Sequence, residues 1–141
     1  MASAQISETF NASIDKVFKV LSDYSSYPDF MDGVKSVDIL ETNGDTSKVQ
    51  YNINIIKKFQ YVLNCTAVEN KSVSWSFDSG DLFASNNGVW DLTDNGDGTT
   101  TVDYKIDIDF KVKVPGMISK KLVSSNLPSM MKSVHKKAKS L

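Results

Sequence analysis

The chain has 141 residues, of which 40% are apolar and 23% charged, and its formal net charge is −1. These values are typical of one globular domain and exclude fibrous and disordered chains. No apolar run is long enough to cross a bilayer, and the first ten residues lack the basic and apolar regions of a secretory signal. The single cysteine, Cys65, has no partner for an internal disulfide. We therefore expect one domain over residues 1–141 in a reducing, cytoplasmic setting.

The charges are distributed unevenly. All 16 basic residues are lysines, and the segment after Val114 holds six of them and no acid. The remainder carries ten lysines against 17 acids, a net of −7. A lysine-rich C-terminal helix can contact an acidic partner or an anionic membrane surface. It can equally be a solvated face whose positive charge suits the C-terminal end of a helix. The lack of arginine argues against nucleic-acid binding, which favours the arginine fork.

The first third of the chain predicts a strand and two short helices. Residues 3–10 alternate in polarity, as in a strand, and Ser13 is placed to cap a helix. Apolar residues then recur at helical spacing from Ile14 to Leu21, which predicts an amphipathic helix ending near Asp23. The segment 24–33 contains Pro28 and reads as a second short helix or a turn.

Strand patterns dominate the middle of the chain. Alternating polarity predicts strands around residues 36–40, 49–55, 59–67, 73–77 and 82–92. Turn signals separate them at residues 43–45 and 80–81, and adjacent Asn/Asp-Gly pairs at 95–98 predict a tight hairpin. The clearest strand runs from Val102 to Val114, with apolar residues on one face and Asp or Lys on the other.

The C-terminal segment predicts one long amphipathic helix. Pro115 and Gly116 end the last strand, and apolar residues recur near helical spacing from Gly116 to Leu141. Pro128 is expected to kink this helix near Ser124. The fold class is therefore α+β, with a curved antiparallel sheet of six to seven strands wrapped around a long C-terminal helix.

One amphipathic helix covers only part of a strongly curved sheet, so the remaining apolar face is expected to line a cavity; a fully packed core is the alternative. Tyrosine hydroxyls and amides on that face would orient a ligand, since apolar sites carry a few placed polar groups. The ligand-binding residues expected from the sheet and the helix are Tyr51, Tyr61, Trp75, Asn86, Trp90, Tyr104 and Met130.

No catalytic residue, metal site or cofactor is predicted. The only histidine, His135, lies among lysines and is expected at the surface, which excludes ordinary Cys/His zinc sites and histidine-based triads. Cys65 is expected to be an inert core thiol. The glycine-containing turn at 95–98 lacks the features of a phosphate loop and of a calcium loop. Asp107 and Asp109 fall on the wet face of their strand, so they are not an acid/base pair.

The sequence resembles the polyketide cyclase/dehydrase and coenzyme Q-binding proteins of the START-like (SRPBCC) superfamily. The resemblance covers nearly the whole chain and rests on the segments Ser13–Phe18, Leu21–Tyr24, Tyr27–Phe30, Val34–Val37, Ile39–Leu40, Gly88–Leu92, Gly98–Tyr104 and Val114–Gly116. It implies a helix-grip fold with a hydrophobic cavity between the sheet and the C-terminal helix. It also implies that Tyr27, Pro28 and Phe30 shape one end of this cavity, which adds Tyr27 and Phe30 to the expected ligand-binding residues.

Three functions follow as hypotheses. The first is a binding or carrier protein for a hydrophobic small molecule such as a lipid, a quinone or a polyketide-like compound. The second is a cyclase/dehydrase-like enzyme that uses Tyr51, Tyr61 or Tyr104 as polar groups. The third, implied by the ribosome-association members of the superfamily, is a macromolecular interaction module that uses the lysine-rich helix. Without arginine or a buried histidine, the sequence favours carriage over catalysis.

Overall fold

A computed structural model describes residues 2–31, 33–54, 57–120 and 127–141 of the chain. Seven strands and two short helices follow the predicted order, and helical segments end the chain. The bounds are β1 (Ala2–Phe10), α1 (Ile14–Ser22), the 3-10 helix η1 (Tyr24–Asp29), β2 (Val34–Asn43), β3 (Thr46–Asn54), β4 (Lys58–Val68), β5 (Ser72–Gly80), β6 (Phe83–Asp94), β7 (Thr100–Phe110), α2 (Gly116–Lys120) and α3 (Leu127–Lys139). Among the helices described, none combines the length and the apolar character that a membrane span requires.

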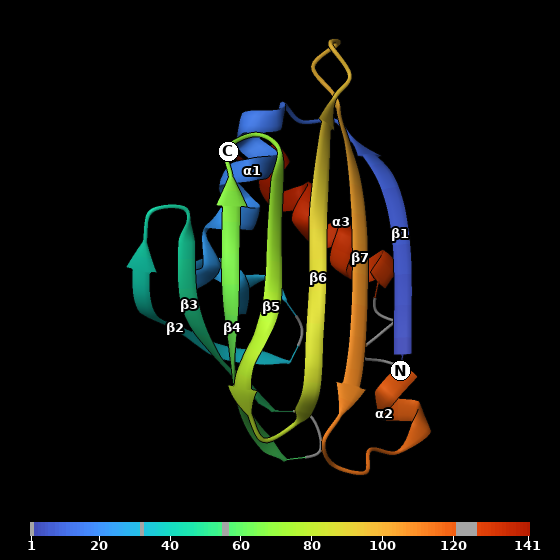
Figure 1. The fold of residues 1–141 in the computed structure, drawn as a ribbon. Helices are drawn as coiled ribbons and strands as arrows, with labels where there is room; N and C mark the ends of the chain where they lie inside the picture. Colours follow the sequence, from blue (N-terminus) through green and yellow to red (C-terminus); the bar gives the residue numbers. More distant parts are fainter. Residues whose placement is uncertain (1, 32, 55–56, 121–126) are drawn as a thin grey trace.

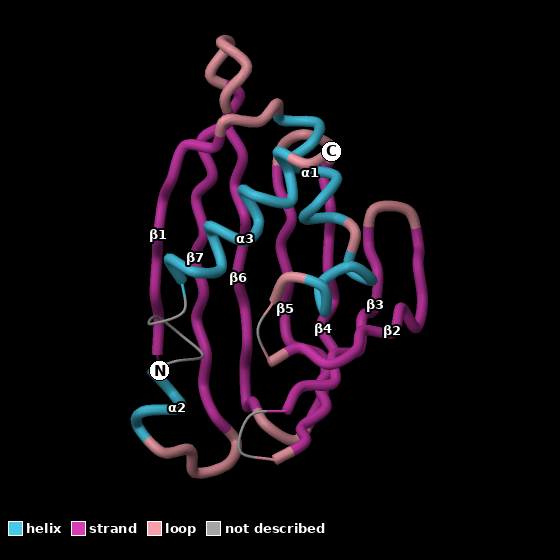
Figure 2. Tube along the Cα trace, turned by 180° about the vertical axis from the view of Figure 1, so that it is seen from behind, coloured by secondary structure: helices cyan, strands magenta, loops and turns pink. Residues whose placement is uncertain are grey.

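All seven strands form one antiparallel sheet in the order β1-β7-β6-β5-β4-β3-β2. The first strand therefore lies beside the last, with Ala2 opposite Ile108 and Phe10 opposite Thr100. The sheet curves, and α1, η1 and α3 all lie on the same side of it, with α3 crossing diagonally behind β6 and β7 (Figures 1 and 2). The predicted α+β architecture, in which a curved sheet grips a C-terminal helix, is confirmed.

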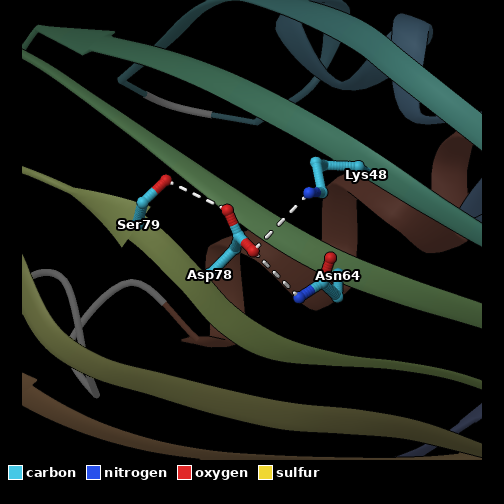
Figure 3. A network of polar contacts seen from close by, with 4 residues as sticks. All are labelled: Lys48, Asn64, Asp78 and Ser79. Atoms are coloured by element: carbon cyan, nitrogen blue, oxygen red, sulfur yellow. Dashed lines mark hydrogen bonds and ion pairs between the residues drawn. The ribbon is translucent and has the colours of Figure 1, made fainter.

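The other face of the sheet is polar, as the alternating strands predict. On this face Asp78 of β5 accepts hydrogen bonds from the Asn64 amide (3.4 Å) and from the Ser79 hydroxyl (3.1 Å). The Lys48 Nζ lies 3.8 Å from the same carboxylate, so that residues of three adjacent strands are joined (Figure 3). Partly exposed ion pairs of this kind contribute about 0–1 kcal/mol. The apolar core is consequently confined to the side of the sheet that carries the helices.

The strand β7 is shorter than its sequence pattern predicts. Its apolar residues are buried up to Ile108, but the strand ends at Phe110 and not at Val114, and Val112 is exposed. The reason lies in the neighbouring strand. The Lys111 N–H donates to the Leu82 carbonyl, and β6 begins only at Phe83, so the ladder has no partner residues beyond this point.

In the described part of the C-terminal segment, where one helix from Gly116 to Leu141 was expected, the structure gives the helices α2 and α3. Residues 121–126, including the expected kink at Ser124, lie outside the described part of the chain. Pro128 lies in the first turn of α3, where its missing N–H removes no helical hydrogen bond. The buried stripe of α3 packs on α1 and β1 and consists of Leu127, Met131, Val134 and Ala138.

His135, which was expected at the surface, is half-buried and contacts the end of β1. Its ring stacks on Phe10 with centroids 4.6 Å apart and planes within 3°, and its Nε2 accepts a hydrogen bond from the Asn11 N–H (2.9 Å). His135 follows the fully buried Val134 and comes four residues after the fully buried Met131, so it lies at the edge of the stripe that faces the sheet. The next residue, Lys136, is exposed. The histidine therefore ties α3 to the end of β1.

Candidate ligand-binding site

A cavity of about 170 Å³ lies between the inner face of the sheet and η1. Strands β3 to β7 supply most of its wall, and η1 with the residues that follow it supplies the opposite side. Met130 is the only residue of α3 in the wall among those described. The predicted cavity therefore exists, but among the described residues η1 and the segment after it, rather than α3, form most of the wall facing the sheet.

Eight of the nine expected ligand-binding residues line this cavity. They are Tyr27, Tyr51, Tyr61, Trp75, Asn86, Trp90, Tyr104 and Met130. Phe30 does not line it; its ring packs edge-on against Tyr27, with centroids 5.6 Å apart. Contact of these side chains with a ligand remains a prediction.

Eleven of the described wall residues were not singled out from the sequence as ligand contacts. They are Tyr24, Met31, Gly33, Val34, Ile53, Leu63, Val73, Phe83, Ile106 and Ile108, together with Cys65, which was expected to be packed in the core. Two of them carry a signal in the sequence. Tyr24 precedes Tyr27 by three residues, which places both on one face of a 3-10 helix. Val73 alternates with Trp75 and therefore shares its face of β5.

Two glycines allow close contacts in the wall of the cavity. Gly88 lies opposite Trp75 in the β5–β6 ladder, and a Cβ added there would come within 2.1 Å of the indole ring. Gly80 lies opposite Tyr61 in the β4–β5 ladder, and a Cβ there would come within 2.6 Å of the Tyr61 Cβ. Gly88 therefore allows the indole ring to lie close to the sheet, and Gly80 allows the backbones of β4 and β5 to approach each other closely.

The rings of the wall contact one another in two groups. Near η1, Tyr51 stacks on Tyr61 (5.2 Å between centroids), and Tyr27 lies 6.3 Å from Tyr51. Further along the sheet, Tyr104 lies 4.5 Å from Trp90 and 5.8 Å from Trp75. Aromatic pairs at these distances each contribute about 0.5–1.5 kcal/mol beyond their buried area. The wall therefore carries two clusters of contacting aromatic rings.

Few polar atoms point into the cavity, and their hydrogen bonding differs. The Tyr27 hydroxyl donates to the Leu21 carbonyl, and the Trp75 Nε1–H donates to the Asn86 Oδ1 at 2.9 Å. The Tyr24 hydroxyl is buried and has no hydrogen-bond partner in the described part of the chain. An unpaired buried hydroxyl costs about 1–3 kcal/mol. Tyr24 therefore combines a ring that lines the cavity with a hydroxyl that has no partner in the described part of the chain.

The lining carries no charge near neutral pH. Among the described residues that line the cavity there is no Lys, His, Asp or Glu, whereas all five tyrosines of the chain line it. Burial raises the pKa of each tyrosine above its ordinary value of 10. Burial also raises the pKa of the Cys65 thiol to about 12, against a smaller lowering by the Tyr51 hydroxyl. The wall therefore offers neutral hydrogen-bonding groups and no general base poised near neutral pH.

Tyr24 and Tyr27 form a matched pair for testing these hydrogen bonds. We expect Tyr24→Phe to leave the free energy of unfolding of the ligand-free protein unchanged or to raise it by about 1 kcal/mol, because it removes an unpaired buried hydroxyl. We expect Tyr27→Phe to lower it by about 0.5–1.5 kcal/mol, because it removes the bond to Leu21. Urea unfolding of both variants measures the difference. Equal losses in the two variants would contradict an unpaired Tyr24 hydroxyl.

The sheet, the helices and the cavity have relatives among known proteins. Residues 10–134 match the family model described as polyketide cyclase/dehydrase and lipid transport. A search of the curated proteins gives no match. No group of three or more metal-binding side chains occurs in the described ranges.

Solved structures share the fold over almost the whole chain. A START superfamily protein from Mycobacterium smegmatis is 20% identical, with a TM-score of 0.83 over 98% of this chain and 97% of that one. The Zhui aromatase/cyclase from Streptomyces sp. R1128 is 14% identical, with a TM-score of 0.85 over 98% of this chain and 93% of that one. A protein from Thermus thermophilus is 16% identical, with a TM-score of 0.82 over 99% and 98% of the two chains. Identities this low show the fold alone, whereas the family model spans most of the chain, and this chain therefore belongs to the polyketide cyclase/dehydrase and lipid-transport family of the START-like superfamily.

Proposed function

We propose that this protein binds one neutral hydrophobic small molecule in the cavity between its sheet and η1, and releases it unchanged. The observation that carries the proposal is the aromatic, uncharged wall, in which burial keeps every tyrosine and the one cysteine protonated. A fatty-acid carboxylate would find no cation among the described lining residues, and burying an unpaired charge is costly. Apolar surface with a few polar groups is what a site for a neutral ligand provides.

The size of the cavity restricts the ligand further. A volume of about 170 Å³ is close to that of an engineered cavity of about 150 Å³ that holds benzene, and below the range of about 300–1,000 Å³ for drug-sized ligands. We therefore propose a ligand portion of one or two rings. The head group of a quinone, as in the coenzyme Q-binding branch of the superfamily, fits this volume, whereas a long acyl or isoprenoid chain would have to extend beyond it.

Native mass spectrometry of the purified protein tests this proposal. We expect a bound mass that organic extraction releases, or a rise in melting temperature with neutral one- and two-ring compounds, because a ligand that binds only the folded state stabilises it. Val73→Phe, which places a ring in the cavity wall, should abolish binding. The same substitution at the exposed Val68 is the matched control and should leave binding intact.

Two results would refute the proposal. One is a purified protein that carries no apolar molecule and whose melting temperature no compound of the panel shifts. The other is binding that Val73→Phe and Val68→Phe weaken equally, since the ligand would then lie elsewhere.

A cyclase/dehydrase-like reaction is the second candidate, favoured by the tyrosine hydroxyls of the wall. Tyr61 and Tyr104 carry no hydrogen bond within the described chain and, being protonated, can donate one to a carbonyl oxygen of a substrate. Incubation of the identified ligand with the protein separates the two candidates. Recovery of the ligand unchanged supports binding alone, and a product of altered mass supports catalysis.

Peripheral contact of the lysine-rich helix with an acidic surface remains a prediction. Lys132, Lys136 and Lys139 are exposed on α3, away from its buried stripe. Their exposure fits both such a contact and a solvated helix face.

A further inference from the structure

The side chain of Asn86 offers a hydrogen-bond donor to the interior of the cavity. Asn86 lies in β6, two residues before Gly88 and on the same face of the strand. It is only 4% exposed and lines the cavity. Buried amides are normally fully hydrogen-bonded, so each of its atoms needs a partner.

Trp75 determines which way this amide points. The indole of Trp75 lies over Gly88, where even a Cβ would collide with it, and reaches the side chain of Asn86. The indole nitrogen can only donate a hydrogen bond, so the amide atom 2.9 Å from it must be the oxygen. The Asn86 Oδ1 is thereby occupied, and the Nδ2 is directed elsewhere.

The Nδ2 of Asn86 donates no hydrogen bond to any residue that the structure describes, and it belongs to a side chain of the cavity wall. The ring of Tyr104 lies 5.8 Å from that of Trp75 and 4.5 Å from that of Trp90, and all three side chains line the cavity with Asn86. A flat ring held against these aromatic side chains would bring a substituent within reach of the amide. An acceptor atom of a bound molecule would then supply the partner that the Nδ2 lacks among the described residues.

We propose that the cavity selects a neutral ring compound that carries a hydrogen-bond acceptor, such as a ring carbonyl, and that Asn86 Nδ2 binds this acceptor while Trp75 holds the amide in place. The inference rests on the proposed function and adds that a ligand of the same site must carry a hydrogen-bond acceptor. Asn86 is a specificity-determining residue in this arrangement, and Trp75 is a positioning residue.

Two probes of nearly the same shape test the polar requirement. 1-Indanone carries a ring carbonyl, and indane is the same bicycle without it. We expect the purified protein to bind 1-indanone about three- to tenfold more tightly than indane, the ratio that one net hydrogen bond supplies. Calorimetric titration gives both dissociation constants, each relative to partition of the probe from water into hexane.

Variants of the pair assign the effect to its residues. Asn86→Leu should remove the preference for 1-indanone and keep the affinity for indane within about threefold. Trp75→Phe should reduce the preference for 1-indanone without abolishing the binding of indane. Loss of packing alone would not produce this result, because it would weaken the binding of both probes alike. Ser85→Ala, on the adjacent residue of β6, is the control and should keep the full preference.

A measurement on the unaltered protein covers the case in which Asn86→Leu does not fold. The infrared carbonyl band of bound 1-indanone should lie below its position in hexane, as a hydrogen-bonded carbonyl does. A band at the hexane position, or equal affinities for the two probes, would overturn the role of Asn86 while leaving a hydrophobic binding site in place. Failure of both probes to bind would overturn this inference together with the proposed function.

Discussion

Phe10→Ala is expected to lower the free energy of unfolding by about 3–5 kcal/mol, the usual cost of removing a fully buried phenylalanine. Phe10 is 0% exposed and lies at the end of β1, opposite Thr100 of β7. Its ring also stacks on His135 of α3. One side chain thus connects the edge of the sheet to the helix that the sheet grips, and its loss leaves a cavity at that junction.

Urea unfolding of Phe10→Ala and of His135→Ala, with the double variant, separates the stack from the rest of the core. His135→Ala should cost less, on the order of 1 kcal/mol, because the histidine is only partly buried and gives up one stack and one hydrogen bond. The double variant should lose less than the two single losses together, because the rings contact each other. The exposed Thr9→Ala is the control. A loss below about 1 kcal/mol for Phe10→Ala would show that this junction is not part of the core.

The protein is expected to lose stability steeply in alkaline solution. Burial raises the pKa of Tyr27, Tyr51, Tyr61 and Tyr104 above the ordinary 10, and that of Cys65 from 9.0 to about 12. Above these ordinary values the unfolded chain releases protons that the folded chain retains. The folded state then binds more protons, so the free energy of unfolding falls as the pH rises. The loss begins with Cys65 near pH 9 and grows with the tyrosines above pH 10.

Between its unfolded and its folded pKa, each such group lowers the free energy of unfolding by about 1.4 kcal/mol per pH unit. The four tyrosines together lower it by about 5 kcal/mol per pH unit. That is a large part of the total stability of a domain, about 5–15 kcal/mol. Tyrosinate absorbance and circular dichroism, followed together during alkaline titration, should therefore change in one transition.

Two variants test whether the buried thiol and tyrosines cause the loss of stability in alkaline solution. Cys65→Ala should flatten the curve between about pH 9 and 10, where the thiol acts alone. Tyr61→Phe should make the fall of the free energy of unfolding above pH 10 less steep by about 1.4 kcal/mol per pH unit, the contribution of one group. Tyrosine ionisation that precedes the loss of secondary structure would contradict a sealed, protonated cavity wall.

The sequence by itself determined the elements of this fold, because they rest on local periodicity and turn chemistry. Alternation over two residues indicates a strand wherever one face is buried. It predicted that the apolar side chains of β3 to β7 lie on the same face of one sheet. Positive backbone φ angles at Gly44 and Gly96 occur at the predicted hairpin turns. The same alternation identified the aromatic side chains Tyr51, Tyr61, Trp75, Trp90 and Tyr104 that line the cavity on the sheet, but it did not single out Val73 or Phe83 as ligand contacts.

Only the tertiary structure decided how the elements close over that face. The end of β7 depends on where β6 begins, and the contact of His135 depends on how α3 docks against β1. The roles of η1 and of Tyr24 in the cavity wall follow from packing between segments distant in the chain. The direction of the Asn86 amide depends on Trp75 in a neighbouring strand, which Gly88 allows to approach. Each of these features arises from contacts between separate elements, which local sequence patterns do not encode.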